Sequence, residues 1–389
     1  MPASGSCESR PQVLDQRLAG EGVGAEPDNP GSRPAELKRG KPDRTHPDHA
    51  PVLVLTRCAA HRGDAALTRV QTHPHHSRVP TPYRDVRRSV VEVLASAVLF
   101  GTTGTSASFA PTSTGSVAIG SARLVIGGFG LIAVVPLLGG RRGRVARLWR
   151  TPLGFFAGLM TAVYQLGFFA GVSLAGVALA TLVTIGSGPV LVGVISWATL
   201  GERPTAVWWT STAICITGLV LLTLDGSGEP GVVLGGLVFS LAAAIGYAAY
   251  TVATKQLMHK GAASSEAMAA AFGLGAVVLL PVLLVAGVGW LTTPAGLGVA
   301  LWLGFATTTL AYVLFGRGLR LLPAGPVATL VLAEPLVATM LGVGVLGERL
   351  GPGGWIGALL VALGLGLQGL ASVRSQSDEE PSLLGNAPV

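Results

Sequence analysis

Charged side chains are scarce in this sequence of 389 residues. Asp, Glu, Lys and Arg make up only 12% of it, whereas 50% is hydrophobic and the mean hydropathy is +0.58. A water-soluble globular domain carries about 25% charged residues. The composition therefore excludes an ordinary soluble domain and indicates an integral membrane protein.

Cysteine and histidine are also few. Cys7 and Cys58 lie in a polar segment and Cys215 lies in an apolar run, so no spacing typical of disulfides or metal ligands is present. After residue 88 the sole histidine is His259, which is too little for the active site of an integral-membrane enzyme. No Walker loop is present, which argues against ATP-driven transport by this chain alone. We expect no metal and no cofactor.

The two ends of the chain differ in composition from the rest. Residues 1–88 hold 24 of the 47 charged residues, 11 of the 25 prolines and a single aromatic residue, Tyr83. Such a segment buries too little apolar surface to fold, so we predict a disordered polar tail over 1–88 and a short disordered tail over 374–389. The basic residues of the first tail are interspersed with ten acidic ones and lack a stacking surface, so we expect no nucleic acid as partner.

Long apolar runs fill the remaining sequence. A helix needs about 20 mostly apolar residues to cross the hydrocarbon core, and the runs are continuous, which excludes a transmembrane barrel. We predict an all-α integral membrane fold with ten transmembrane helices. They span residues 90–109, 116–138, 153–174, 177–200, 206–224, 232–257, 266–290, 296–319, 325–346 and 354–373.

Basic residues between these helices indicate the orientation. With both termini in the cytoplasm, ten basic residues fall in the cytoplasmic connections and Arg349 alone falls outside, as the positive-inside rule requires. The ten are Arg141, Arg142, Arg144, Arg147, Arg150, Arg203, Lys255, Lys260, Arg317 and Arg320.

An internal repeat divides the chain into residues 89–225 and 231–373. Ala180-Thr181-Leu182-Val183 recurs as Ala328-Thr329-Leu330-Val331, and Gly201-Glu202-Arg203 recurs as Gly347-Glu348-Arg349. Each half holds five predicted helices, and an odd number of crossings inverts the second half. Two inverted-topology five-helix repeats are a recurrent plan of secondary transporters, so transport is the leading hypothesis.

Repeat-related prolines point to the middle of two helices. Pro189 and Pro335 each lack an N–H and crowd the carbonyl four residues earlier, at Ile185 and Val331. A freed carbonyl in the membrane must find a partner or line a polar cavity. We predict helix breaks that frame a site, with simple kinks as the alternative.

Several motifs resemble the EamA type of the drug/metabolite transporter superfamily. They are Phe100-Gly101-Thr102-Thr103, Ser121-Ala122-Arg123, the two Gly-Glu-Arg turns, Gly246-Tyr247-Ala248-Ala249-Tyr250-Thr251 and Ala333-Glu334-Pro335. The resemblance covers residues 89–373. It implies a ten-helix inverted-repeat carrier in a bacterial plasma membrane, usually an exporter of amino acids, metabolites or toxic compounds. One departure is that the first half has Gly188 where the second has Glu334.

Charge inside the membrane is costly and usually functional. Glu92 and Glu266 lie near the inner ends of their predicted helices and are expected to reach headgroups or water, which leaves Arg123 and Glu334 as the charged residues deeper in a span. Glu334 lies near the middle of its span, so it should carry a proton or face a cation, a donor network or water. It then either exchanges a proton during transport or provides a counter-charge for an amino or quaternary group, unless it is tied to Arg123 or to the backbone in a structural role. Arg123 lies close enough to the outer membrane surface for its side chain to reach it.

By contrast, Glu202 lies in a turn, where we expect it to terminate its helix and pair locally.

Mid-membrane polar and aromatic residues are further candidates. Tyr247, Tyr250 and Gln165 are preferred for substrate binding, because aromatic faces suit a cationic or ring-bearing solute. Thr307, Thr308 and Thr309 are expected to bond their own helix carbonyls instead.

The sequence thus predicts a secondary active transporter that moves metabolites, amino acids or drug-like compounds by alternating access, with export as the expected direction and proton coupling as a hypothesis. The rivals are a passive channel or a non-transporting scaffold, and then an integral-membrane enzyme. Small-xxx-small pairs such as Gly353 and Gly357 are explained equally by packing within a monomer and by a homodimer.

Overall fold

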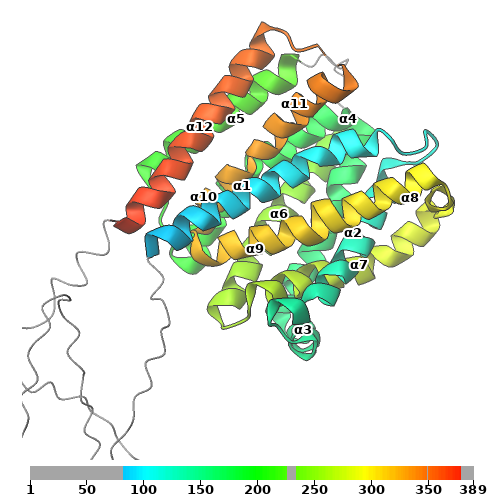
Figure 1. Ribbon diagram of the computed structural model, residues 1–389, viewed down its shortest axis with the longest axis horizontal. Helices are drawn as coiled ribbons and strands as arrows, with labels where there is room; N and C mark the ends of the chain where they lie inside the picture. Colours follow the sequence, from blue (N-terminus) through cyan, green and yellow to red (C-terminus); the bar gives the residue numbers. More distant parts are fainter. Residues whose placement is uncertain (1–81, 226–233, 348, 378–389) are drawn as a thin grey trace, which may run out of the picture. The chain divides into compact units, whose positions relative to one another are not determined.

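The structure is a computed structural model that describes residues 82–225, 234–347 and 349–377 (Figure 1). All regular elements in these ranges are helical, and ten segments are long and apolar enough to cross a membrane. They confirm the all-α fold with ten transmembrane helices. The elements are α1 (Pro82–Ala107), α2 (Ser116–Val134), η2 (Pro136–Leu138), α3 (Arg142–Trp149), α4 (Pro152–Leu200), α5 (Ala206–Asp225), α6 (Leu234–His259), α7 (Ser264–Ala286), η3 (Gly289–Thr292), α8 (Pro294–Leu301), η4 (Trp302–Leu310), α9 (Ala311–Leu321), α10 (Ala324–Val331), α11 (Ala333–Leu346) and α12 (Pro352–Ser377).

The first helix begins earlier than the sequence predicted. α1 starts at Pro82, so residues 82–88 are helical and the predicted boundary of the tail at residue 88 is wrong. Asp85 in the first turn favours a helix start, and Arg88 pairs with Glu92 one turn later at 3.1 Å. The remaining tail residues, 1–81 and 378–389, lie outside the described residues, as do the linker residues 226–233 and Glu348.

Glycines of the repeated turns end two equivalent helices. Gly201 follows α4 with φ 72°, and Gly347 follows α11 with φ 71°. Both angles lie in the left-handed region, where glycine is favoured because it has no Cβ. The repeat in the sequence therefore corresponds to a repeat in backbone conformation.

The two repeat-related prolines have different effects on their helices. The ninth span divides at Leu332 into α10 and α11, just before Pro335. α4 continues through Pro189, and its single non-helical residue is Gly176, at the end of the third span. The predicted break at Pro189 is therefore not observed. Loss of one N–H removes one hydrogen bond, and the turns on either side of Pro189 keep the helix intact.

Helix packing follows the internal repeat. α2 packs against α7, and α5 packs against α12, which lies along it in Figure 1. α1 packs against α9 and α11, just as the repeat-equivalent α6 packs against both spans of α4. A Cβ on Gly218 would lie 2.6 Å from the carbonyl oxygen of Gly357, and the reverse holds as well. Gly357 therefore serves close packing within the chain, since a side chain at either position would collide with backbone.

Candidate functional site

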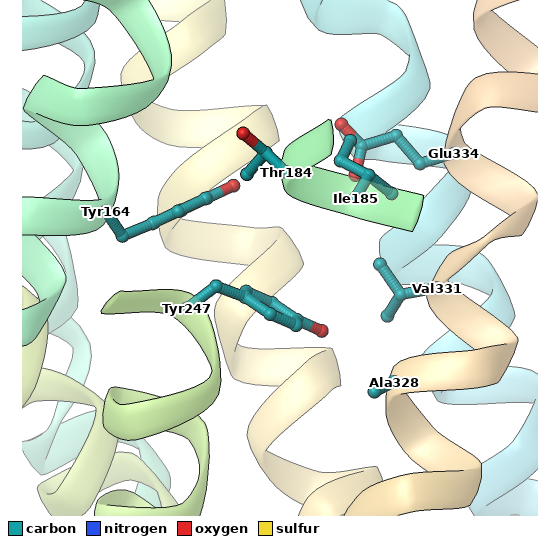
Figure 2. A pocket seen from close by; sticks show the side chains of 7 residues that line it. All are labelled: Tyr164, Thr184, Ile185, Tyr247, Ala328, Val331 and Glu334. Atoms are coloured by element: carbon teal, nitrogen blue, oxygen red, sulfur yellow. The ribbon is translucent and has the colours of Figure 1, made fainter. Parts of the chain in front are cut away.

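A small cavity lies between the two halves, in the middle of the spans (Figure 2). Its empty volume is about 270 Å³, but a water molecule can place its centre in only about 10 Å³ of this space. That is room for about one water. The lining residues are Tyr164, Thr184 and Ile185 of α4, Tyr247 of α6, Ala328 and Val331 of α10, and Glu334 of α11.

Glu334 provides the only charge among the lining residues. It lies in the first turn of α11, directly after the interruption at Leu332, where the helix dipole favours a negative charge. Among the described residues, no hydrogen bond or ion pair engages its carboxylate. Figure 2 shows this carboxylate and the Tyr164 hydroxyl both extending toward Thr184, whose own hydroxyl donates to the Ser240 carbonyl at 2.9 Å. The carboxylate is therefore free to engage a solute or a proton.

Two glycines let the helices approach closely at this cavity. A Cβ on Gly188 would lie 3.2 Å from the ring of Tyr247, and a Cβ on Gly101 would lie 2.8 Å from the carbonyl oxygen of Glu334. The offset of 146 residues that relates Pro189 to Pro335 also relates Gly188 to Glu334 and Gly101 to Tyr247. The two contacts are thus equivalents under the repeat, and the cavity lies where the halves meet symmetrically. Its charge is contributed by the second half alone.

Tyrosine rings form one side of the cavity. The ring centroids of Tyr164, Tyr247 and Tyr250 lie 5.6–5.7 Å apart in all three pairs. Tyr250 does not line the cavity but supports the other two, and its hydroxyl lies 3.2 Å from that of Tyr312. The buried hydroxyl of Tyr247 has no hydrogen-bond partner among the described residues. A buried polar group of this kind usually marks a place for a ligand or water.

The side chains of Arg123 and Gln165 form hydrogen bonds with neighbouring helices and do not line the cavity. The Arg123 side chain is 5% exposed; its Nε donates to Thr308 Oγ1 at 3.2 Å, and its Nη2 donates to the Thr307 carbonyl at 3.3 Å. The Gln165 amide donates to the Gly120 carbonyl at 3.3 Å. Arg123 thus ties α2 to η4, and Gln165 ties α4 to α2.

The threonine run lies in η4, a π-helical segment. Thr307 and Thr308 both donate to the Leu303 carbonyl, at 2.8 and 2.9 Å, and Thr309 donates to the carbonyls of Gly304 and Gly127. The prediction that these threonines bond helix carbonyls is confirmed. A π-helical turn leaves carbonyls free for such bonds and is frequent at functional sites.

Sequence reasoning did not select Thr184 or Ala328 as lining residues. A signal for the cavity was present in the paired prolines, because the crowded carbonyls belong to Ile185 and Val331, and both residues line the cavity. Tyr164, which also lines the cavity, is the direct neighbour of Gln165. The structure shows that the two side chains point to different partners.

Glu202 has partners far away in the sequence, so the expectation that it pairs locally is wrong. Its Oε1 lies 3.1 Å from Lys255 Nζ of α6, and its Oε2 accepts from the backbone N–H of Ala324 at 2.7 Å. Lys255 also donates to the carbonyls of Leu319, at 3.0 Å, and Leu322. The first N–H groups of α10 need an acceptor, and Glu202 supplies one from the other half.

Together these features define a class of protein: a ten-span helical membrane protein with a polar cavity enclosed between two related halves, an arrangement typical of membrane transporters. Comparisons with known proteins agree. The EamA-like transporter family matches the chain twice, over residues 88–224 and 234–369. The chain belongs to this family, and it is a membrane transporter of the drug/metabolite type.

Individual relatives support the same assignment. The uncharacterized transporter YwfM of Bacillus subtilis (strain 168) is 38% identical over 273 residues, which cover 70% of this chain and 90% of that protein. The putative permease-like protein YdzE of the same strain is 38% identical over 65 residues, covering 17% of this chain and 83% of that protein. A protein of known crystal structure superposes with a TM-score of 0.62 at 18% identity, over 74% of this chain and 98% of its own, which shows the fold alone. The family and the relatives point to a transporter and not to an enzyme.

Proposed function

We propose that this protein is a secondary active transporter that exports a small organic solute by alternating access. The observation that carries the proposal is the Glu334 carboxylate, which no described residue engages, in a cavity lined by Tyr164 and Tyr247 between the two repeats. A carboxylate in the membrane interior is costly and is kept where it serves substrate or ion binding. The small size of the cavity suits a closed state, which the two halves must open by rocking to admit a solute.

The chemistry of the cavity favours a solute with an amino or quaternary ammonium group. Glu334 supplies the counter-charge, and the faces of Tyr164 and Tyr247 attract a cation through their ring quadrupoles. Amino acids, amine metabolites and drug-like amines all carry such a group. Proton exchange at Glu334 is the coupling step we favour, because export against a gradient needs an energy source and this acid is the only titratable carboxyl that lines the cavity.

Transport by a carrier is tested with the purified protein in liposomes. Vesicles preloaded with an unlabelled amine should transiently accumulate the labelled amine, and the initial rate should saturate with concentration. Candidates are amino acids, polyamines, cationic dyes and, as a matched control, neutral analogues without the amino group. A linear, non-saturating flux without counterflow would indicate a channel, and no flux with any compound would indicate a scaffold.

Inverted topology is the second part of the proposal, with both termini in the cytoplasm of a bacterial plasma membrane. Five spans separate the turns that begin at Gly201 and Gly347, so these turns should lie on opposite sides. A reporter active only in the cytoplasm should function when fused after Gly201 and not when fused after Gly347, and a periplasmic reporter should show the reverse. Equal behaviour of the two fusions would contradict the inverted repeat.

A further inference from the structure

A second and larger cavity lies beside α5 and α12. It measures about 1390 Å³, including the part that is open to the outside. Its walls come from the end of α4, the loop before α5, the loop before α10 and the last turns of α12, and it shares no lining residue with the tyrosine cavity. α4 ends on the side of the membrane where α1 begins and α12 ends, since even numbers of spans separate these points.

The α12 side of this cavity changes from apolar to basic along the helix. Leu367, Leu370 and Arg374 line it at a spacing of three and four residues, which places them on one face of the helix. Leu370 is 60% exposed. A molecule lying along this face would meet leucine side chains first and a guanidinium at the membrane surface.

The mouth of the cavity carries excess positive charge. Arg203 lines it from the loop before α5 and Arg374 from α12, and both are exposed. In the described parts of the chain, no carboxylate lies within 4.0 Å of either guanidinium. The acid at this mouth is Glu202, which is already engaged by Lys255 and by the N–H of Ala324. Two arginines are therefore available to an anion.

Tryptophans place this mouth at the level of the lipid headgroups. Trp197, near the end of α4, is 54% exposed, and Trp209, near the start of α5, is 46% exposed. Exposed indoles in membrane proteins concentrate at the interface between hydrocarbon and water. The leucines of α12 then face the acyl region and the arginines face the headgroups.

We propose that this cavity binds a phospholipid with an anionic headgroup. The phosphate lies between Arg203 and Arg374, and an acyl chain follows Leu367 and Leu370. Guanidinium groups bind phosphate oxygens in charge-assisted pairs, and basic pockets between transmembrane helices are recurrent sites for anionic lipids. A soluble anion would leave the apolar wall unused, and a zwitterionic lipid would not match the excess positive charge.

The test compares binding of phosphatidylglycerol and phosphatidylcholine with the same acyl chains to the delipidated full-length protein in detergent, by native mass spectrometry. We expect one phosphatidylglycerol to bind preferentially. The double variant Arg203→Gln with Arg374→Gln should weaken its binding roughly 30-fold, given about 1 kcal/mol for each basic residue. Arg150→Gln with Arg320→Gln removes two exposed arginines elsewhere and should leave binding unchanged.

Equal binding of the two lipids, or an equal loss in both double variants, would overturn the proposal. The acidic residues Asp378, Glu379 and Glu380 provide a further outcome. Binding is therefore also measured with a chain that ends at Ser377. If the two arginines matter for binding in that shortened chain but not in the full chain, the acidic residues occupy the cavity in place of the lipid, which contradicts the proposal.

Discussion

Replacement of Glu334 by glutamine is expected to reduce net transport about 100-fold while leaving insertion and folding intact. Glutamine preserves the size of the side chain but carries neither charge nor exchangeable proton, and a lost charge-assisted hydrogen bond of about 3 kcal/mol corresponds to a factor of that order. The measurement is the initial rate of amine accumulation in proteoliposomes under an imposed pH gradient. Glu334 is the one acid that lines the cavity, so no other lining group can replace it.

Glu92→Gln is the matched control. Glu92 also lies in a transmembrane helix, but it pairs with Arg88 at 3.1 Å and with Arg317 at 3.8 Å and does not line the cavity. Its variant should transport at the normal rate. If Glu334→Gln transports normally with unchanged pH dependence, the carboxylate has a structural role.

Exchange measurements separate the two roles of Glu334. If the carboxylate serves mainly to carry a proton, the glutamine variant should lose accumulation but retain counterflow of labelled against unlabelled solute. If it serves as the counter-charge for the substrate, counterflow should be lost as well, together with stabilisation of the purified protein by the amine. A ligand that binds the native state raises its apparent stability, so thermal unfolding reports the second role directly.

Sequence patterns were sufficient to predict the positions of the spans and some of the residues that line the cavity. Apolar runs fix helix positions because the hydrocarbon core sets a minimum length, and the structure begins and ends each span within a few residues of the prediction. Glu334 stood out because a charge is rare inside such a run. Tyr247 was selected as an aromatic residue in mid-membrane, and it does line the cavity.

The sequence did not predict the direction in which each side chain points from its helix. Tyr164 and Gln165 are adjacent, yet one lines the cavity and the other bonds the Gly120 carbonyl. A helix that is apolar all round has no polar stripe from which its buried face can be read. The rotation of α4 is set by its packing against several helices, chiefly α6, α7 and α10. The long-range partners of Glu202 were hidden for the same reason, since 122 residues separate it from Ala324.

Two positions that are equivalent under the repeat, Gly188 and Glu334, carry different residues, so only one half contributes a charge to the cavity. Gly188 leaves space for the Tyr247 ring, whereas the equivalent Glu334 presents its backbone to Gly101 and directs its side chain into the cavity. Two near-equivalent contacts thus bring the halves together, and a single carboxylate gives the cavity its polarity.

Substitution of Lys255 by methionine is expected to lower the free energy of unfolding by about 3 kcal/mol, since removal of one partner from a buried ion pair leaves the other charge and its acceptors unpaired. Lys255 is 3% exposed and joins Glu202 to the carbonyls of Leu319 and Leu322. Adding Glu202→Gln should restore part of the loss, because the amide oxygen still accepts from Ala324. Lys260→Met, at an exposed lysine near the same helix end, should have little effect.

The same pair should control access to the tyrosine cavity. Glu202 and Lys255 join the two halves on the side where α1 begins and α12 ends, so their loss should favour the conformation that is open to that side. A cysteine at Ala328, which lines the cavity, should then react about tenfold faster with an impermeant thiol reagent from that side, as expected for a shift of about 1.4 kcal/mol between conformations. Cys7, Cys58 and Cys215 are first replaced by serine. A rate that rises equally from both sides would indicate general loosening of the helices, and an unchanged rate would show that the pair stabilises the fold without gating the cavity.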